Sequence, residues 1–98
     1  MVVPLPEDLI VPHATALRSL LLAALEAGQP LELDGRTVNE VDAAGLQVLC
    51  AARRSALARG TSLTFLQGGR SAALIVAIEL AGLGMTAGEA WLREREEA

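Results

Sequence analysis

The chain has 98 residues and a formal net charge of −4, and 52% of its residues are hydrophobic although only Phe65 and Trp91 are aromatic. This length and composition predict one domain, residues 1–98, with an aliphatic core, and the absence of a Lys/Arg cluster excludes a nucleic-acid footprint. The single cysteine, Cys50, cannot form a disulfide within the chain, and no apolar run is long enough for a bilayer, so we expect a cytoplasmic protein without direct membrane insertion.

The beginning of the chain predicts edge strands followed by a helix. Residues 2–5 and 9–11 are strand candidates, and Pro4 and Pro6 restrict them to the edge of a sheet. Apolar residues then recur at helical spacing until Gly28, which can end a helix with a left-handed backbone. These helical positions are Leu17, Leu20, Leu21, Ala24 and Leu25.

Three further strand candidates follow, at residues 31–33, 38–41 and 62–67. A second helix is predicted between the last two of them, from Ala43 to about Arg59. Asp42 stands at its N-cap, where a carboxylate can accept hydrogen bonds from the free amides of the first turn. Strands that alternate with helices in this way predict an α/β layered domain.

A third helix is predicted at residues 71–81, and Glu79 is the one polar residue between Ala72 and Ala81. A helix that is apolar all round is usually buried, which is difficult in so short a chain. Either a C-terminal helix covers its far face through Trp91 and Leu92, which is the arrangement we expect, or a second copy covers it in a homodimer. A capping box at residues 86–89 opens that C-terminal helix, and residues 88–98 are expected to be peripheral.

The order Val41-Asp42-Ala43-Ala44-Gly45-Leu46 resembles the switch segment of STAS domains, the sulfate-transporter and anti-sigma-factor-antagonist family, which typically reads Asp-Ser-Ser-Gly-Leu or Asp-Thr-Ala-Gly-Leu. The resemblance extends to Leu31-Glu32-Leu33-Asp34, to the basic helix end at residues 53–60 and to Glu79-Leu80-Ala81-Gly82-Leu83, and so covers nearly the whole chain. It implies a STAS-like single domain with a mixed sheet of four or five strands and about four helices.

The resemblance also implies where a partner binds. In phosphorylatable members the acceptor is the hydroxyl residue directly after the Asp, and here Ala43 occupies that position and cannot take a phosphate. The implied docking surface is the start and outer face of the second helix, with the expected contact residues Asp42, Ala43, Ala44, Gln47, Val48 and Ala51. The alternative is that alanine is simply a good helix former on a surface. On helical geometry the core face carries Leu46, Leu49, Arg53 and Ala56.

These features predict a non-enzymatic bacterial regulatory module that binds a signalling protein, in the manner of an anti-sigma-factor antagonist. The implied partner is an anti-sigma-factor-type kinase or a chemotaxis-linked protein. An alternative is the small cytoplasmic STAS subunit of an ABC-type lipid-asymmetry transporter, whose partner would be an ABC ATPase. A self-associating structural domain is a third interpretation, suggested by the apolar third helix.

The remaining chemical candidates are weak. No nucleophile–base pair or metal cluster is visible in the sequence, so we expect no enzyme activity, no metal and no cofactor. His13 has no catalytic partner, which favours a surface or cap role. Asp34 and Asp42 would make a poor metal pair, and a strand end and a helix cap explain their spacing better. The segment Gly68-Gly69-Arg70-Ser71 could attract an anion but lacks the spacing and lysine of a P-loop, and Cys50 is expected to be a buried, unreactive thiol.

Overall fold

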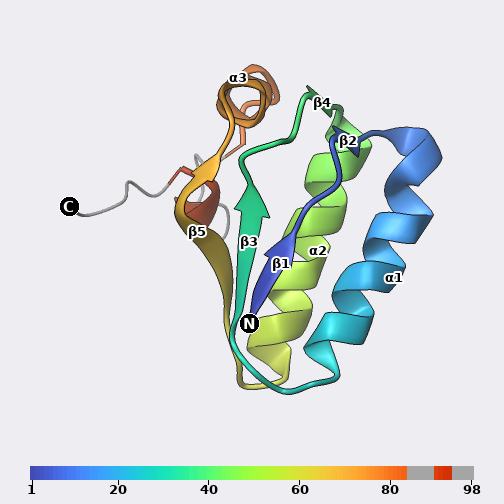
Figure 1. Cartoon of the computed structure of the whole chain (residues 1–98), viewed down its shortest axis with the longest axis vertical. Coiled ribbons are helices and arrows are strands. Elements are labelled where there is room, and N and C mark those ends of the chain that lie inside the picture. Colours follow the sequence, from blue (N-terminus) through green and yellow to red (C-terminus); the bar gives the residue numbers. More distant parts are fainter. Residues whose placement is uncertain (84–89, 94–98) are drawn as a thin grey trace.

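The computed structural model describes residues 1–83 and 90–93 of the chain. Strands and helices alternate along it, which confirms the predicted α/β class (Figure 1). No helix within these ranges combines the length and the apolar character needed to cross a membrane. The elements in chain order are β1 (Val2–Pro4), β2 (Asp8–Leu9), the 3-10 turn η1 (Val11–His13), α1 (Ala14–Leu25), β3 (Leu31–Gly35), β4 (Glu40–Val41), α2 (Ala43–Ala58), β5 (Leu63–Arg70), α3 (Ala72–Leu80) and the 3-10 turn η2 (Ala90–Leu92).

The strands form a three-stranded sheet in the order β1-β3-β5 and a two-stranded sheet of β2 and β4. Every described pair is parallel, whereas a mixed sheet was expected. The reason is that α1 and α2 are crossover helices, each of which returns the chain to the edge where the next strand begins. Three α-helices are described rather than about four, because the expected fourth falls on residues 86–97, of which the structure describes only 90–93.

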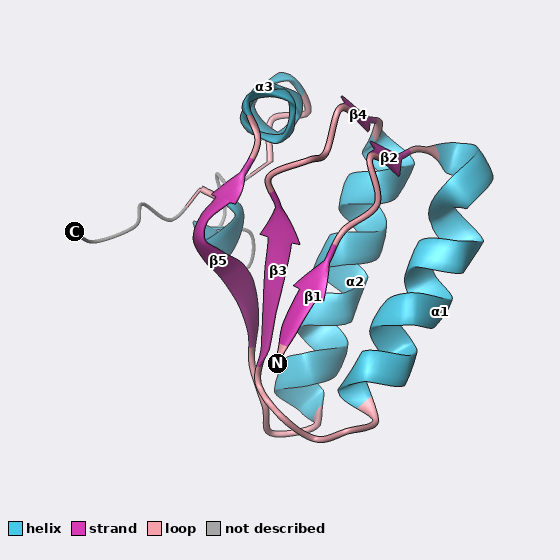
Figure 2. Cartoon of the chain, in the orientation of Figure 1, coloured by secondary structure: helices cyan, strands magenta, loops and turns pink. Residues whose placement is uncertain are grey.

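One face of the three-stranded sheet carries the core. Leu31 and Leu33 on β3 are fully buried, while Glu32 between them is exposed. The helices α1 and α2 lie side by side on the buried face (Figure 2), and the predicted core positions Leu46, Leu49 and Ala56 are confirmed there. The buried residues of the two helices are Leu17, Leu21 and Leu25 on α1 and Gly45, Leu46, Leu49, Ala52 and Ala56 on α2. A fully buried leucine side chain stabilises the fold by roughly 1.5–3 kcal/mol.

The predicted helix ends are confirmed. Gly28, Gly60 and Gly82 follow α1, α2 and α3 with φ angles of 74°, 76° and 69°, a conformation that residues with a Cβ rarely adopt. By contrast, the last strand extends beyond the predicted residue 67. Gly68, with φ of 72°, allows a bulge, after which Arg70 pairs with Gly35 on β3.

Gly45 fixes the distance between α2 and β2. A Cβ on Gly45 would overlap the carbonyl oxygen of Leu9 and would lie 2.6 Å from its carbonyl carbon and 2.8 Å from its Cβ. Only glycine therefore lets the first turn of α2 rest on the backbone of β2. This contact places the start of α2 next to β2 and β4.

The described part of the C-terminal stretch packs against β5 and α2. Trp91 and Leu92 are buried, and the Trp91 ring stacks on Phe65 with centroids 5.4 Å apart. The Arg53 guanidinium lies 5.2 Å from the centre of the Trp91 ring, and the Arg70 guanidinium donates to the Trp91 carbonyl oxygen at 2.9 Å. The capping box expected at residues 86–89 lies outside the described residues.

Candidate functional site

The start of α2 is organised by the Asp42 carboxylate. Its Oδ1 accepts a hydrogen bond from the Gly45 amide at 3.0 Å, the N-cap geometry expected from the sequence. Its Oδ2 accepts from the Val11 amide at 2.8 Å and so ties the first turn of α2 to η1. The bonds from Gly45 and then from Val11 hold the pKa of Asp42 below its ordinary value of 3.8, because both favour the charged carboxylate.

The six residues expected to contact a partner fall on two sides of α2. Ala44, Gln47, Val48 and Ala51 line a hollow of about 380 Å³ between α2 and α1. Ala44 and Val48 are half-buried there, because α1 packs beside them. Asp42 and Ala43 instead line a larger hollow of about 780 Å³, which lies between β4, the start of α2 and α3.

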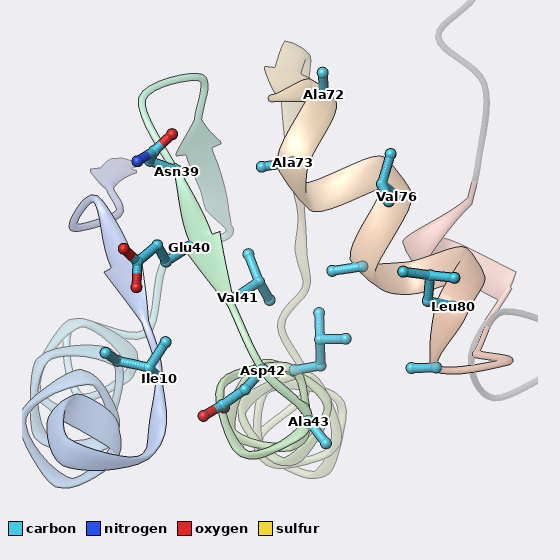
Figure 3. A pocket seen from close by; sticks show the side chains of 13 residues that line it. Ile10, Asn39, Glu40, Val41, Asp42, Ala43, Ala72, Ala73, Val76 and Leu80 are labelled. Atoms are coloured by element: carbon cyan, nitrogen blue, oxygen red, sulfur yellow. The ribbon is translucent and has the colours of Figure 1, made fainter.

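The larger hollow brings together segments that are far apart in the sequence (Figure 3). Ile10 lies at one side and β4 crosses the middle. Figure 3 shows Val41 on β4 and Ala73 on α3 pointing into the space between the two elements. The α3 residues that line the hollow are entirely apolar and are Ala72, Ala73, Val76, Ala77 and Leu80. We call this space the α2–α3 hollow.

The far face of α3 is exposed, and the expected cover by Trp91 and Leu92 is wrong. Trp91 packs on Phe65 of β5 instead, since the stack of the two aromatic rings buries it on the sheet. On α3, only Leu74 and Ile78 are buried. Ile75, Val76 and Leu80 are 45%, 52% and 84% exposed, an unusual concentration of large apolar side chains on a nine-residue helix.

Among the weaker candidates, Asp34 and Ser71 make local structural contacts, whereas the His13 side chain does not cap a helix. The Asp34 carboxylate accepts from Nε and Nη2 of Arg36 at 2.9 and 2.8 Å, and this pairing lowers the pKa of Asp34. Ser71 caps α3 by accepting from the Leu74 amide at 3.1 Å. His13 is exposed at the start of α1, and its side chain makes no cap hydrogen bond. Cys50 is half-buried and packs against the core.

Sequence reasoning missed the contribution of α3 to this site. The sequence suggested that the C-terminal helix or a second copy covers the third helix, and it suggested a partner at the start of the second helix, but it did not join these two surfaces. The available signal was the absence of polar residues on α3 outside Glu79, which left more apolar surface than one core contact requires. Within the described residues, no group of three or more His, Cys, Asp and Glu side chains is placed to hold a metal ion.

Comparison with known families supports the resemblance to STAS domains. The family model described as "Mlab, STAS domain" matches residues 1–92. This range includes β1 through η2 and therefore both walls of the α2–α3 hollow. Searches of the curated proteins and of the solved structures found no match.

Proposed function

The chain belongs to the STAS domain family, and from that premise we propose that it is a non-enzymatic regulatory module that binds a partner protein at the α2–α3 hollow. The observation that carries the proposal is the position of Ala43. The resemblance to the family's switch segment implies that Ala43 replaces the acceptor hydroxyl of phosphorylatable members, and Ala43 lines the same hollow as the exposed apolar residues of α3. A partner that covers Val76 and Leu80 would bury apolar surface that the isolated chain leaves in water.

The missing hydroxyl supports constitutive binding. A phosphate on residue 43 would add a charge of roughly −1.5 to −2 beside the hollow, enough to repel or reorganise a partner. Alanine at positions 43 and 44 removes this possibility. We therefore propose a module of the anti-sigma-factor-antagonist type whose partner, a kinase-like or chemotaxis-linked protein, is not released by phosphorylation at this site.

Affinity capture from the native lysate tests the proposal. The tagged wild-type chain is compared with Leu80→Asp, which places a charge in the apolar wall, and with Leu57→Asp, which makes the same change at a 56% exposed leucine outside the hollow. A third bait, Ala51→Arg, blocks the hollow between α1 and α2. We expect a partner that is retained by wild type, Leu57→Asp and Ala51→Arg and lost by Leu80→Asp, with the melting temperature of Leu80→Asp unchanged.

The identity of that partner separates the two candidate pathways. A kinase-like or chemotaxis protein supports the signalling function, whereas an ABC ATPase with its membrane subunits supports the transporter alternative. A partner that is lost by Ala51→Arg and kept by Leu80→Asp would move the site to the other side of α2. If all four baits capture only the chain itself, the proposed binding function is wrong.

Restoring a hydroxyl at residue 43 tests the proposal that phosphorylation does not regulate this chain at that position. Under the kinase interpretation, Ala43→Ser incubated with the captured partner and ATP gains the mass of one phosphate, while the wild-type chain does not. Ala44→Ser is the matched control, because residue 44 lines the other hollow. Phosphate on neither variant, with a kinase-like partner bound, would contradict the equivalence of Ala43 with the family's acceptor.

A further inference from the structure

The α3 side of the α2–α3 hollow is shaped to receive a helix. Ala72, Val76 and Leu80 stand four residues apart and form one row along α3, with Ala73 and Ala77 in the adjacent row. Rows of this spacing are the ridges that pack between the side chains of a second helix. Because alanine side chains in both rows are small, the axis of a second helix can approach α3 closely. The side chains of an extended peptide alternate between two faces, so they do not match the four-residue spacing of these rows.

On the opposite side of the hollow, Glu40 lines the space, and two further acids, Glu7 and Asp8, lie on the neighbouring segment of the chain. Asp8 on β2 and Glu40 on β4 are partners in the parallel register, which places their two side chains next to each other on the same face. Glu7 precedes them, and its carbonyl oxygen accepts from the Asn39 amide at 2.7 Å and the Glu40 amide at 3.2 Å. We call Glu7, Asp8 and Glu40 the acidic edge. Figure 3 shows the Glu40 carboxylate on the side of β4 that faces away from α3.

No cation neutralises the acidic edge within residues 1–83 and 90–93. Arg36 lies in the turn before β4, but its guanidinium already pairs with the Asp34 carboxylate at 2.8 Å. The residues that line the hollow include Glu40 and Asp42 but neither Lys nor Arg. Like charges on directly opposed strand residues destabilise a sheet. A cationic partner would relieve that repulsion.

We propose that the α2–α3 hollow binds a helix of a partner protein whose apolar stripe is bordered on one side by Lys or Arg residues. The stripe packs on Ala72, Val76 and Leu80, and the basic border lies along the acidic edge. This inference rests on the proposed function and specifies the chemistry of the partner. The charge complementarity favours such a helix over a second copy, because the exposed apolar helix of a second copy, α3, carries Glu79 and neither Lys nor Arg.

A helical-peptide display library provides the probe. Each peptide has about 18 residues, or five helical turns, and carries a fixed stripe of Leu and Ala. The positions along each of the two borders of the stripe are Lys, Glu or Gln at random. The library is selected against the wild-type chain, against Glu7→Lys/Glu40→Lys, and against the matched control Glu26→Lys/Glu32→Lys. The control makes the same change in net charge at two exposed glutamates outside the hollow.

We expect the wild-type chain to enrich Lys over Glu at one border by about tenfold, the effect of roughly one well-placed charge pair. The Glu7→Lys/Glu40→Lys chain should reverse the preference, and the Glu26→Lys/Glu32→Lys chain should retain it. Selected peptides should lose binding to Leu80→Asp. Added salt should reduce the Lys preference, because the acidic edge is exposed to solvent.

The contrary outcomes separate the inference from the proposed function. Peptides that need Leu80 but show no charge preference, or the same preference on Glu7→Lys/Glu40→Lys, would refute the basic border and leave the docking hollow intact. If no peptide depends on Leu80, a helix is not the occupant. Sedimentation equilibrium adds a further test, since a wild-type dimer that Leu80→Asp dissociates would assign the hollow to a second copy.

Discussion

The helices α2 and α3 begin and end alike, but α2 leaves one large apolar side chain exposed, Leu57, whereas α3 leaves three exposed, Ile75, Val76 and Leu80. Asp42 and Ser71 each accept from the third amide of their helix, at 3.0 and 3.1 Å, and a glycine of positive φ follows each helix. Yet α2 buries five residues against β2, β5 and α1, whereas α3 buries only Leu74 and Ile78. Caps and glycines set where a helix begins and ends, and its position relative to the sheet sets what it buries.

The difference has a topological cause. α2 is a crossover between two strands and therefore lies on the face of the sheet. α3 follows β5 and packs beside β4, so that one side of it contacts the domain (Figure 1). Three large apolar side chains of α3, Ile75, Val76 and Leu80, are therefore exposed. Four predictions test this comparison, from the largest expected effect to the smallest.

Gly45→Ala should be the most damaging change at either helix. The new Cβ would overlap the Leu9 carbonyl and push α2 off β2, which we expect to lower the free energy of unfolding by about 3–4 kcal/mol in urea denaturation. Gly82→Ala, at the end of α3, has open space around its Cβ and only backbone strain, so about 1 kcal/mol is expected. Equal losses for the two would contradict the close contact of α2 with β2.

Two leucine truncations compare burial directly. Leu46→Ala on α2 removes a fully buried side chain and should cost about 3 kcal/mol, whereas Leu80→Ala on α3 should cost less than about 0.5 kcal/mol. Partner binding, measured at a temperature where both variants are folded, should instead fall more for Leu80→Ala than for Leu46→Ala. A large stability loss for Leu80→Ala would mean that α3 is covered within the chain.

The two N-caps should differ in strength. Ser71→Ala removes one hydrogen-bond acceptor and should lower the melting temperature by about 5 °C, as is typical of a lost cap in a domain of this size. Asp42→Ala removes acceptors for both Gly45 and Val11 and should lower it clearly more. Asp42→Asn, which can still cap α2, should fall between wild type and Asp42→Ala. A smaller fall for Asp42→Ala than for Ser71→Ala would show that the bond to Val11 contributes nothing.

Acid should affect the start of α2 and spare the start of α3. The pKa of Asp42 is lowered in the folded chain, so its contribution is present above the ordinary value of 3.8 and is lost as the pH falls through the lowered value. The stability difference between wild type and Asp42→Asn should therefore be largest near neutral pH and shrink below about pH 4. The effect of Ser71→Ala should not change with pH, since a hydroxyl does not titrate in this range. Urea denaturation from pH 7 to pH 3 measures both.

The sequence by itself determined the local features of this protein. Helical spacing, the Asp42 cap and the terminal glycines located α2 and α3 to within one or two residues, because these signals act through the backbone of the segment that carries them. The order of Asp42, Ala43, Ala44 and Gly45 also gave the family, which the match over residues 1–92 supports. The sequence did not locate the end of β5, since Gly68 and Gly69 have the composition of a loop and become part of a strand only through pairing with β3.

Tertiary structure alone decided how the surface is assembled. It divided the six expected contact residues between two hollows, because α1 packs against one side of α2 and leaves the other side open. The tertiary structure packs Trp91 on Phe65 and leaves Leu80 exposed. Both β5 and α3 offer apolar side chains, and the sequence does not show which of them Trp91 contacts. The tertiary structure also set the acidic edge opposite α3. Such contacts join segments that are distant in the sequence, and no local pattern specifies which distant surface a side chain will meet.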